Sequence, residues 1–145
     1  MLFGDIMKWS LQQLNKFFTQ DYEFEETFDF TQEIENISDI LGISETKVKG
    51  RIKVVEYNTF TFLLNIKCRL ILEDARTLEP IDFDLNLDVV ETYSVDDTGD
   101  DEIRIIETNT VDIRPVVWEN ILLEKPIRIV KEESPSELDK EEVKE

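Results

Sequence analysis

Apolar and polar residues alternate over several long stretches in the middle of the chain. In residues 60–72 every even position is apolar, and in residues 81–90 every odd position is apolar. Residues 47–54 alternate cations with apolar side chains, and residues 22–30 place Phe opposite Glu and Asp. A period of two is typical of a strand with one buried face. The pattern therefore predicts four strands of one sheet.

The strands at 47–54 and 60–72 are expected to form a hairpin that turns near Tyr57 and Asn58. A three-residue turn aligns their apolar faces, whereas a two-residue turn offsets them by one position. We therefore expect the three-residue turn. It gathers cations on the outer face of the hairpin, namely Lys47, Lys49, Arg51, Lys53, Lys67 and Arg69.

Acidic residues are expected beside part of this cationic face. If residues 81–90 pair antiparallel with residues 60–72, Asp84 lies near Arg69 and Asp88 lies near Asn65, and opposite charges across strands are favourable. On the pattern alone, strand 47–54 lies too far from these acids to be neutralised by them.

Two short helices are predicted before the hairpin. Ser10 and Gln13 have the spacing of a capping box, which predicts a helix from Ser10 to Phe18 with an apolar face of Leu14, Phe17 and Phe18. Thr31 is expected to cap a second helix that ends before Gly42.

A longer helix is predicted near the C-terminal end. Asp112 is its expected N-cap, and Pro115 falls in the first turn, where its missing N–H is harmless. The helix is expected to span residues 113–124, after an acidic loop and a short strand at 102–106. Its buried stripe is expected to contain Ile113, Val116, Val117 and Ile121.

Together these elements predict an α+β fold in which helices cover a strongly curved, mainly antiparallel sheet, either open or a half-open barrel. Residues 1–130 are expected to form one domain, with a last strand at 125–130. Residues 131–145 are rich in acids and are expected to form a disordered tail.

Composition excludes several classes of site. The chain has 145 residues, a formal net charge of −18, no histidine and one cysteine, Cys68. Imidazole-based catalysis and a cysteine-based zinc site are therefore excluded, and the four glycines form no phosphate-binding motif. No apolar run is long enough to span a membrane and no export leader is evident. We expect a non-enzymatic cytoplasmic protein without a cofactor, a small-molecule substrate or membrane contact.

Six segments in order along the chain resemble the bacterial and plastid YceD family, the large ribosomal RNA subunit accumulation proteins. They are MKWSLQQL (7–14), YEFEETFDF (22–30), ISETKVKGRI (43–52), LEDARTLEPIDFDL (72–85), EIRIIETNTVDI (102–113) and WENILLEKPIR (118–128). The resemblance implies a non-enzymatic factor for the accumulation of large-subunit (23S) ribosomal RNA. Many YceD proteins carry a cysteine where this chain has Asp74, so no thiol or zinc role is carried over.

Two mechanisms fit this implied role. In the first, ribosomal RNA or its precursor binds the cationic face of Lys47, Lys49, Arg51 and Lys53, helped by Lys67, Arg69, Arg76 and the hairpin-tip Tyr57. In the second, an acidic surface with Asp82, Asp84 and Asp88 holds basic ribosomal proteins without RNA contact. A bipartite protein that uses both surfaces is the reading we favour. The simpler alternative for the acidic residues is that they only maintain solubility. The simpler alternative for Arg76 is a structural role in the turn that contains it.

Overall fold

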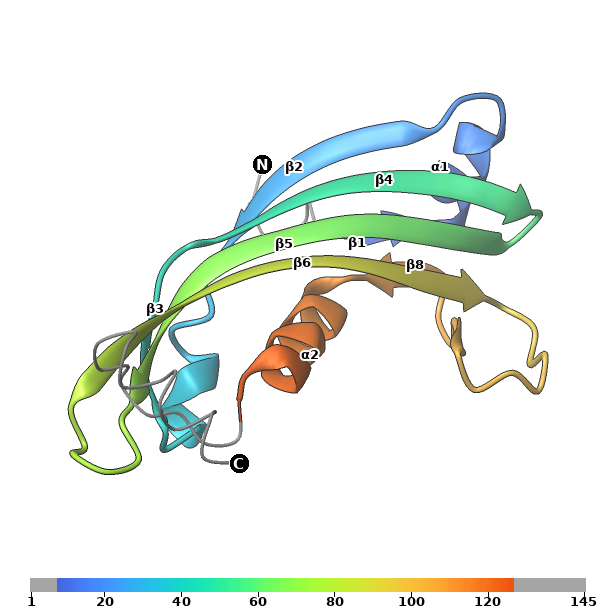
Figure 1. The fold of residues 1–145 in the computed structure, drawn as a ribbon. Coiled ribbons are helices and arrows are strands. Elements are labelled where there is room, and N and C mark those ends of the chain that lie inside the picture. Colours follow the sequence, from blue (N-terminus) through green and yellow to red (C-terminus); the bar gives the residue numbers. More distant parts are fainter. Residues whose placement is uncertain (1–7, 127–145) are drawn as a thin grey trace, which may run out of the picture.

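In the computed structural model, which describes residues 8–126, a long curved sheet arches over a single C-terminal helix (Figure 1). The sheet order is β2 (Tyr22–Phe28), β4 (Thr46–Glu56), β5 (Thr59–Glu73), β6 (Pro80–Ser94) and β7 (Ile103–Ile105). A further strand, β3 (Ile40–Ile43), pairs with the C-terminal end of β5. The predicted α+β fold with a curved sheet is confirmed, and the sheet remains open.

The β4–β5 hairpin has the predicted alignment of its apolar faces, but it reaches this alignment by a different turn. Val54 lies opposite Phe60, whereas Glu56 lies opposite Thr59, so only Tyr57 and Asn58 form the turn. The prediction of a three-residue turn is therefore wrong. The extra residue is the bulged Val55, which restores the register.

The register between β5 and β6 is the predicted one. Arg69 lies opposite Asp84, and Asn65 lies opposite Asp88. Both strands turn most of their apolar side chains toward the concave face, where most of the core lies. A one-residue slip would expose every one of these side chains, which explains why the pattern specified the register.

The N-terminal segment has the predicted capping box, but its α-helix ends at Asn15 and not at Phe18. Ser10 caps α1 (Leu11–Asn15): its hydroxyl accepts the Gln13 N–H at 3.1 Å, and the Gln13 side chain accepts the Ser10 N–H at 2.8 Å. The chain continues as the 3-10 helix η2 (Lys16–Phe18). Before this helix, β1 (Lys8–Ser10) pairs with β8 (Thr110–Asp112), which buries Trp9 against Phe24.

The second predicted helix is wrong. Thr31 caps nothing; instead its N–H donates to the Asp29 carboxylate at 2.9 Å, and only a 3-10 turn, η3 (Glu33–Asn36), follows. Gly42 lies inside strand β3, not beyond a helix end. Pairing with β5 satisfies the backbone of this segment, and such tertiary contacts override a weak local helix signal.

The C-terminal helix α2 (Arg114–Glu124) lies under the concave face of the sheet (Figure 1). All four residues of the predicted stripe are buried. The predicted N-cap is wrong by one residue: Ile113 is the N-cap, and the Asp112 carboxylate accepts the Arg114 N–H at 3.0 Å from the position before it. Within residues 8–126, no helix is long and apolar enough to cross a membrane. The predicted tail at 131–145, nearly all of the predicted strand at 125–130 and the domain limit at 130 lie outside the described residues.

Candidate functional site

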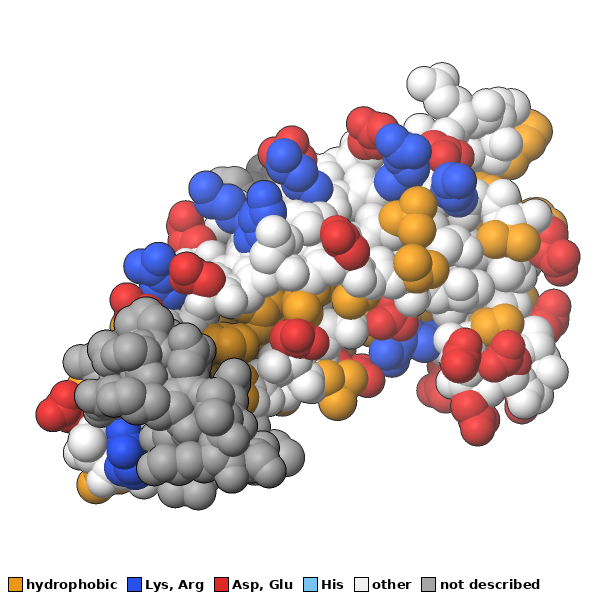
Figure 2. All heavy atoms as spheres, in the orientation of Figure 1, with side chains coloured by type: hydrophobic (Ala, Val, Ile, Leu, Met, Phe, Trp, Pro, Cys, Tyr) orange, Lys and Arg blue, Asp and Glu red, His pale blue; other side chains and the backbone are white. Residues whose placement is uncertain are grey.

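The outer, convex face of the sheet carries the predicted cations. Every odd position from 47 to 53 on β4 is exposed, as are Lys67 and Arg69 on β5. Figure 2 shows Lys and Arg side chains along the upper part of the molecule, with acidic side chains interspersed among them. The cationic face is therefore real, but it is not uniformly positive.

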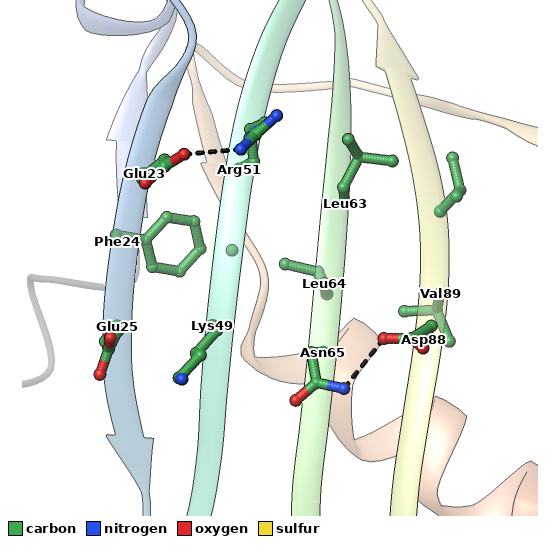
Figure 3. Close-up of a pocket in the computed structure, with 12 residues that line it drawn as sticks. Glu23, Phe24, Glu25, Lys49, Arg51, Leu63, Leu64, Asn65, Asp88 and Val89 are labelled. Carbon is green, nitrogen blue, oxygen red and sulfur yellow. Dashed lines mark hydrogen bonds and ion pairs between the residues drawn. The ribbon is translucent and has the colours of Figure 1, made fainter.

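Strand β2 supplies acids that the sequence pattern did not place beside β4. β2 pairs antiparallel with β4, and Glu23 accepts a hydrogen bond from Arg51 at 2.7 Å (Figure 3). Asp21 lies 3.9 Å from the Lys53 ammonium. The cations of this strand are therefore partly neutralised, by acids from a distant part of the chain and not by those of residues 81–90.

The acids of β6 contact Arg69 and Asn65 of β5. Arg69 donates to Asp84 at 2.7 Å and lies 3.7 Å from Asp82. The hydrogen bond from Arg69 lowers the pKa of Asp84. Asp88 accepts the Asn65 amide at 2.9 Å. The predicted acidic partner surface of Asp82, Asp84 and Asp88 therefore already has partners on β5.

Three lysines remain, and we call Lys47, Lys49 and Lys67 the lysine cluster. Lys47 lies directly opposite Lys67, and Lys49 lies opposite Asn65. Among residues 8–126, no carboxylate lies within 4.0 Å of any of these three ammonium groups. Like charges directly opposite each other across strands are destabilising. An anionic ligand would relieve this repulsion.

A shallow trough of ≈ 650 Å³ crosses the convex face beside the lysine cluster. The Glu23–Arg51 ion pair lies toward one end, and Lys49 and the Asn65–Asp88 pair lie toward the other (Figure 3). Its lining includes Val90, whose exposed fraction is 64%. The trough thus combines charged, amide and apolar groups in one open surface.

Arg76 lies far from this trough, in the turn between β5 and β6. The carboxylate of Asp74, fully buried, accepts the N–H groups of Arg76 and Thr77 at 2.7 and 2.9 Å. Asp74 therefore organises the turn. β5 separates this turn from Tyr57 by 15 residues, or about 50 Å along the strand. The predicted site residues Arg76 and Tyr57 consequently belong to opposite ends of the sheet.

At the Tyr57 end, the structure reveals an exposed aromatic residue that the helical pattern misplaced. Phe18 was expected on the buried face of the first helix, yet its exposed fraction is 74%. The switch from α-helix to 3-10 helix at Lys16 rotates it outward while Phe17 packs against the core. Phe18 and Tyr57 line a common depression of ≈ 360 Å³.

Charged groups on the concave side tie α2 to the sheet and to the segment 29–33 that follows β2. The Glu91 carboxylate accepts hydrogen bonds from Arg104 at 2.8 Å and from the Asn120 amide at 3.0 Å. Arg114 donates to Glu33 and to the Asp29 carbonyl and lies over the Phe30 ring. These pairs have evident structural roles, and the sequence pattern did not indicate them.

Comparison with known proteins finds one relative that covers most of the chain. The uncharacterized protein YlbN of Bacillus subtilis (strain 168) is 35% identical over 126 residues, which covers 85% of this chain and 73% of YlbN. No protein-family model matches the chain, and no solved structure matches it.

Proposed function

The chain belongs to the family of the Bacillus subtilis protein YlbN, and we propose that it is a non-enzymatic cytoplasmic factor that supports the accumulation of large-subunit (23S) ribosomal RNA. In this proposal the convex face of the sheet binds the RNA, or its precursor, through the phosphates. The resemblance of six segments to the YceD family supports the choice of RNA.

The observation that carries the proposal is the Lys47–Lys67 pair. The two residues lie opposite each other on neighbouring strands, and within the described part of the chain neither ammonium group has a carboxylate partner. The other cations of this face, Arg51, Lys53 and Arg69, do have such partners. Phosphates that approach Lys47, Lys49 and Lys67 would add attraction without breaking an existing ion pair.

The net charge of −18 does not prevent such local contact. At physiological ionic strength, exposed charges farther apart than about 8 Å are largely screened from each other. The acids of β6 and of the loop beyond it therefore weaken long-range steering of RNA more than they weaken a contact at the cluster itself.

The alternative is an acidic module that holds a basic ribosomal protein without RNA contact. All three of its candidate acids already have contacts: Asp82 and Asp84 with Arg69, and Asp88 with Asn65. A basic partner would have to compete with these contacts. At the lysine cluster Glu25 of β2 lies opposite Lys49, but among residues 8–126 no ion pair has to be broken there. RNA contact at the lysine cluster is therefore the function we favour.

Replacement of the lysine cluster by Gln tests the proposal. The K47Q/K49Q/K67Q variant should fold normally, because all three side chains are exposed and their strands are held by core residues on the other face. Its affinity for 23S precursor RNA should fall. The slope of log K against log salt should flatten by about 2, or roughly 0.7 for each lost contact with single-stranded RNA.

The matched control is R51Q/K53Q/R69Q, which removes the same formal charge from cations that already have carboxylate partners. Its salt slope should change less than that of the cluster variant. Equal slopes for the two variants would show that only net charge matters. A cluster variant that retains wild-type affinity and restores large-subunit RNA levels in cells would leave the acidic module as the working hypothesis.

A further inference from the structure

Two exposed aromatic rings lie at the hairpin-turn end of the sheet. Phe18 in η2 has an exposed fraction of 74%, and Tyr57 in the β4–β5 turn has one of 78%. They come from segments far apart in the sequence, yet they line the same depression. Exposed aromatic side chains gathered at one place typically mark a binding surface.

Hydrogen bonds hold the two sides of this depression in place. The Asn15 amide donates to the Asn58 side-chain oxygen at 2.8 Å, and the Asn58 N–H donates to the Asn15 side-chain oxygen at 3.1 Å. On the other side of η2, the Phe17 ring stacks on Tyr22 with a centroid distance of 4.4 Å. The end of α1 and the hairpin turn are thus joined before any ligand arrives, which reduces the entropy lost on binding.

The lining of the depression mixes ring surface with polar groups. Leu11, Phe18 and Tyr57 supply apolar area, whereas Gln12, Asn15 and Asn58 supply amides. Lys16 is the single charged residue among the described residues that line it, in a chain whose net charge is −18. The local charge therefore favours an anionic ligand over a cationic one.

We propose that this depression, which we call the aromatic clamp, binds an unpaired base of single-stranded RNA on the Phe18 and Tyr57 rings, with a neighbouring phosphate near Lys16. A nucleobase presents a flat π-face together with polar edges, which matches a lining of rings and amides. Asn15 and Asn58 already bond each other, so Gln12 is the lining amide that would meet a polar edge of the base. The inference rests on the proposed function and deepens it, because it makes single-stranded RNA the substrate class.

Geometry relates the clamp to the lysine cluster. β4 runs from Lys47 directly to the turn that carries Tyr57, so both sites lie along one strand. The spacing from Lys49 to Tyr57 is about 26 Å at 3.3 Å per residue. A single strand of several nucleotides could therefore contact both sites, whereas a duplex has no unpaired base to offer to the clamp.

The test compares a short single-stranded RNA that contains one fluorescent base with the same strand annealed to its complement. F18A/Y57A should bind the single strand about 5- to 150-fold more weakly, the range measured when one base–aromatic stack is removed. It should bind the duplex as wild type does, and its salt slope should be unchanged because no phosphate contact is lost. The base fluorescence quenched by wild type should no longer be quenched.

Two controls separate stacking from folding effects. F18Y/Y57F keeps both rings and should retain wild-type affinity. L78A/L123A removes side chains with exposed fractions of 64% and 76% elsewhere on the surface and should also bind normally.

The outcomes distinguish the clamp from the proposed function. If F18A/Y57A binds the single strand as tightly as wild type while K47Q/K49Q/K67Q binds it weakly, the clamp is overturned and the lysine cluster stands. An equal loss for single strand and duplex, or a lost protein partner with RNA affinity intact, also overturns the clamp. If wild type binds neither RNA, the proposed function and the clamp fail together.

Discussion

Gly50 offers a test of how strand β2 packs beside strand β4. It lies on β4 between Lys49 and Arg51, directly opposite Phe24 of β2. A Cβ added at this glycine would lie 2.2 Å from Cζ and 2.3 Å from Cε1 of the Phe24 ring. The ring therefore lies over the glycine backbone, and Trp9 packs against Phe24 with a centroid distance of 4.9 Å. We expect Gly50→Ala to push this ring out of place.

The size of the effect follows from two opposing contributions. Overpacking of this kind typically costs about 1–3 kcal/mol. Replacing glycine inside a strand by alanine otherwise gains about 0.5–1 kcal/mol, because glycine loses more backbone entropy on folding. Since the contact is too short for small adjustments to relieve, the net loss for G50A should be about 1–2 kcal/mol of unfolding free energy.

A double-mutant cycle isolates the contact from the intrinsic effect of the substitution. In the F24A background the ring is absent, so G50A should now stabilise the protein by about 0.5–1 kcal/mol. The sign of the G50A effect should thus reverse between the two backgrounds. Urea unfolding followed by far-UV circular dichroism measures all four free energies without depending on Trp9 fluorescence.

The refuting result is an unchanged sign. If G50A alters stability equally in both backgrounds, the Phe24 ring does not lie on Gly50, and the placement of β2 beside β4 is in doubt. The Glu23–Arg51 pair, which depends on the same register, would then lose its support as well.

Two further predictions concern the acids of the β5–β6 hairpin. Arg69→Gln should raise the pKa of Asp84 toward its ordinary value near 3.8, measured by carboxyl-carbon NMR titration, because the guanidinium that lowers it is gone. In wild type the Arg69–Asp84 pair stabilises the fold at pH values above the ordinary carboxyl pKa, and this stabilisation is lost as the pH falls through the lowered pKa of Asp84. An Asp84 pKa that stays low in the variant would contradict Arg69 as the cause. Asp74→Ala should cost about 1–3 kcal/mol or more in thermal unfolding, because two backbone N–H groups lose their buried acceptor. Asp74→Asn keeps one side-chain oxygen and should cost less, and equal losses would mean that the oxygen is not the important group.

Local pattern alone determined the central part of this fold. Alternation over β4, β5 and β6 predicted both the strands and their register, including Arg69 opposite Asp84. The reason is that one face of each strand is buried, so any slip by one residue would expose the whole apolar set. The stripe of α2 and the capping box at Ser10 were predictable for a second reason, because each depends on residues close together in the chain.

Contacts between distant segments decided the rest. The local sequence of residues 22–28 does not indicate that this strand pairs with β4. This pairing places Glu23 against Arg51, and among residues 8–126 it leaves the lysine cluster without a carboxylate partner. Likewise, the segment around Gly42, where a helix end was predicted, is a strand because it pairs with β5. A strand must pair its backbone N–H and C=O groups with another strand, and the tertiary fold decides which strand that is. The neighbouring strand brings its own charged side chains, so the charge distribution on the convex face depends on tertiary structure. The aromatic clamp has the same origin, because its two rings approach only when η2 docks beside the hairpin turn.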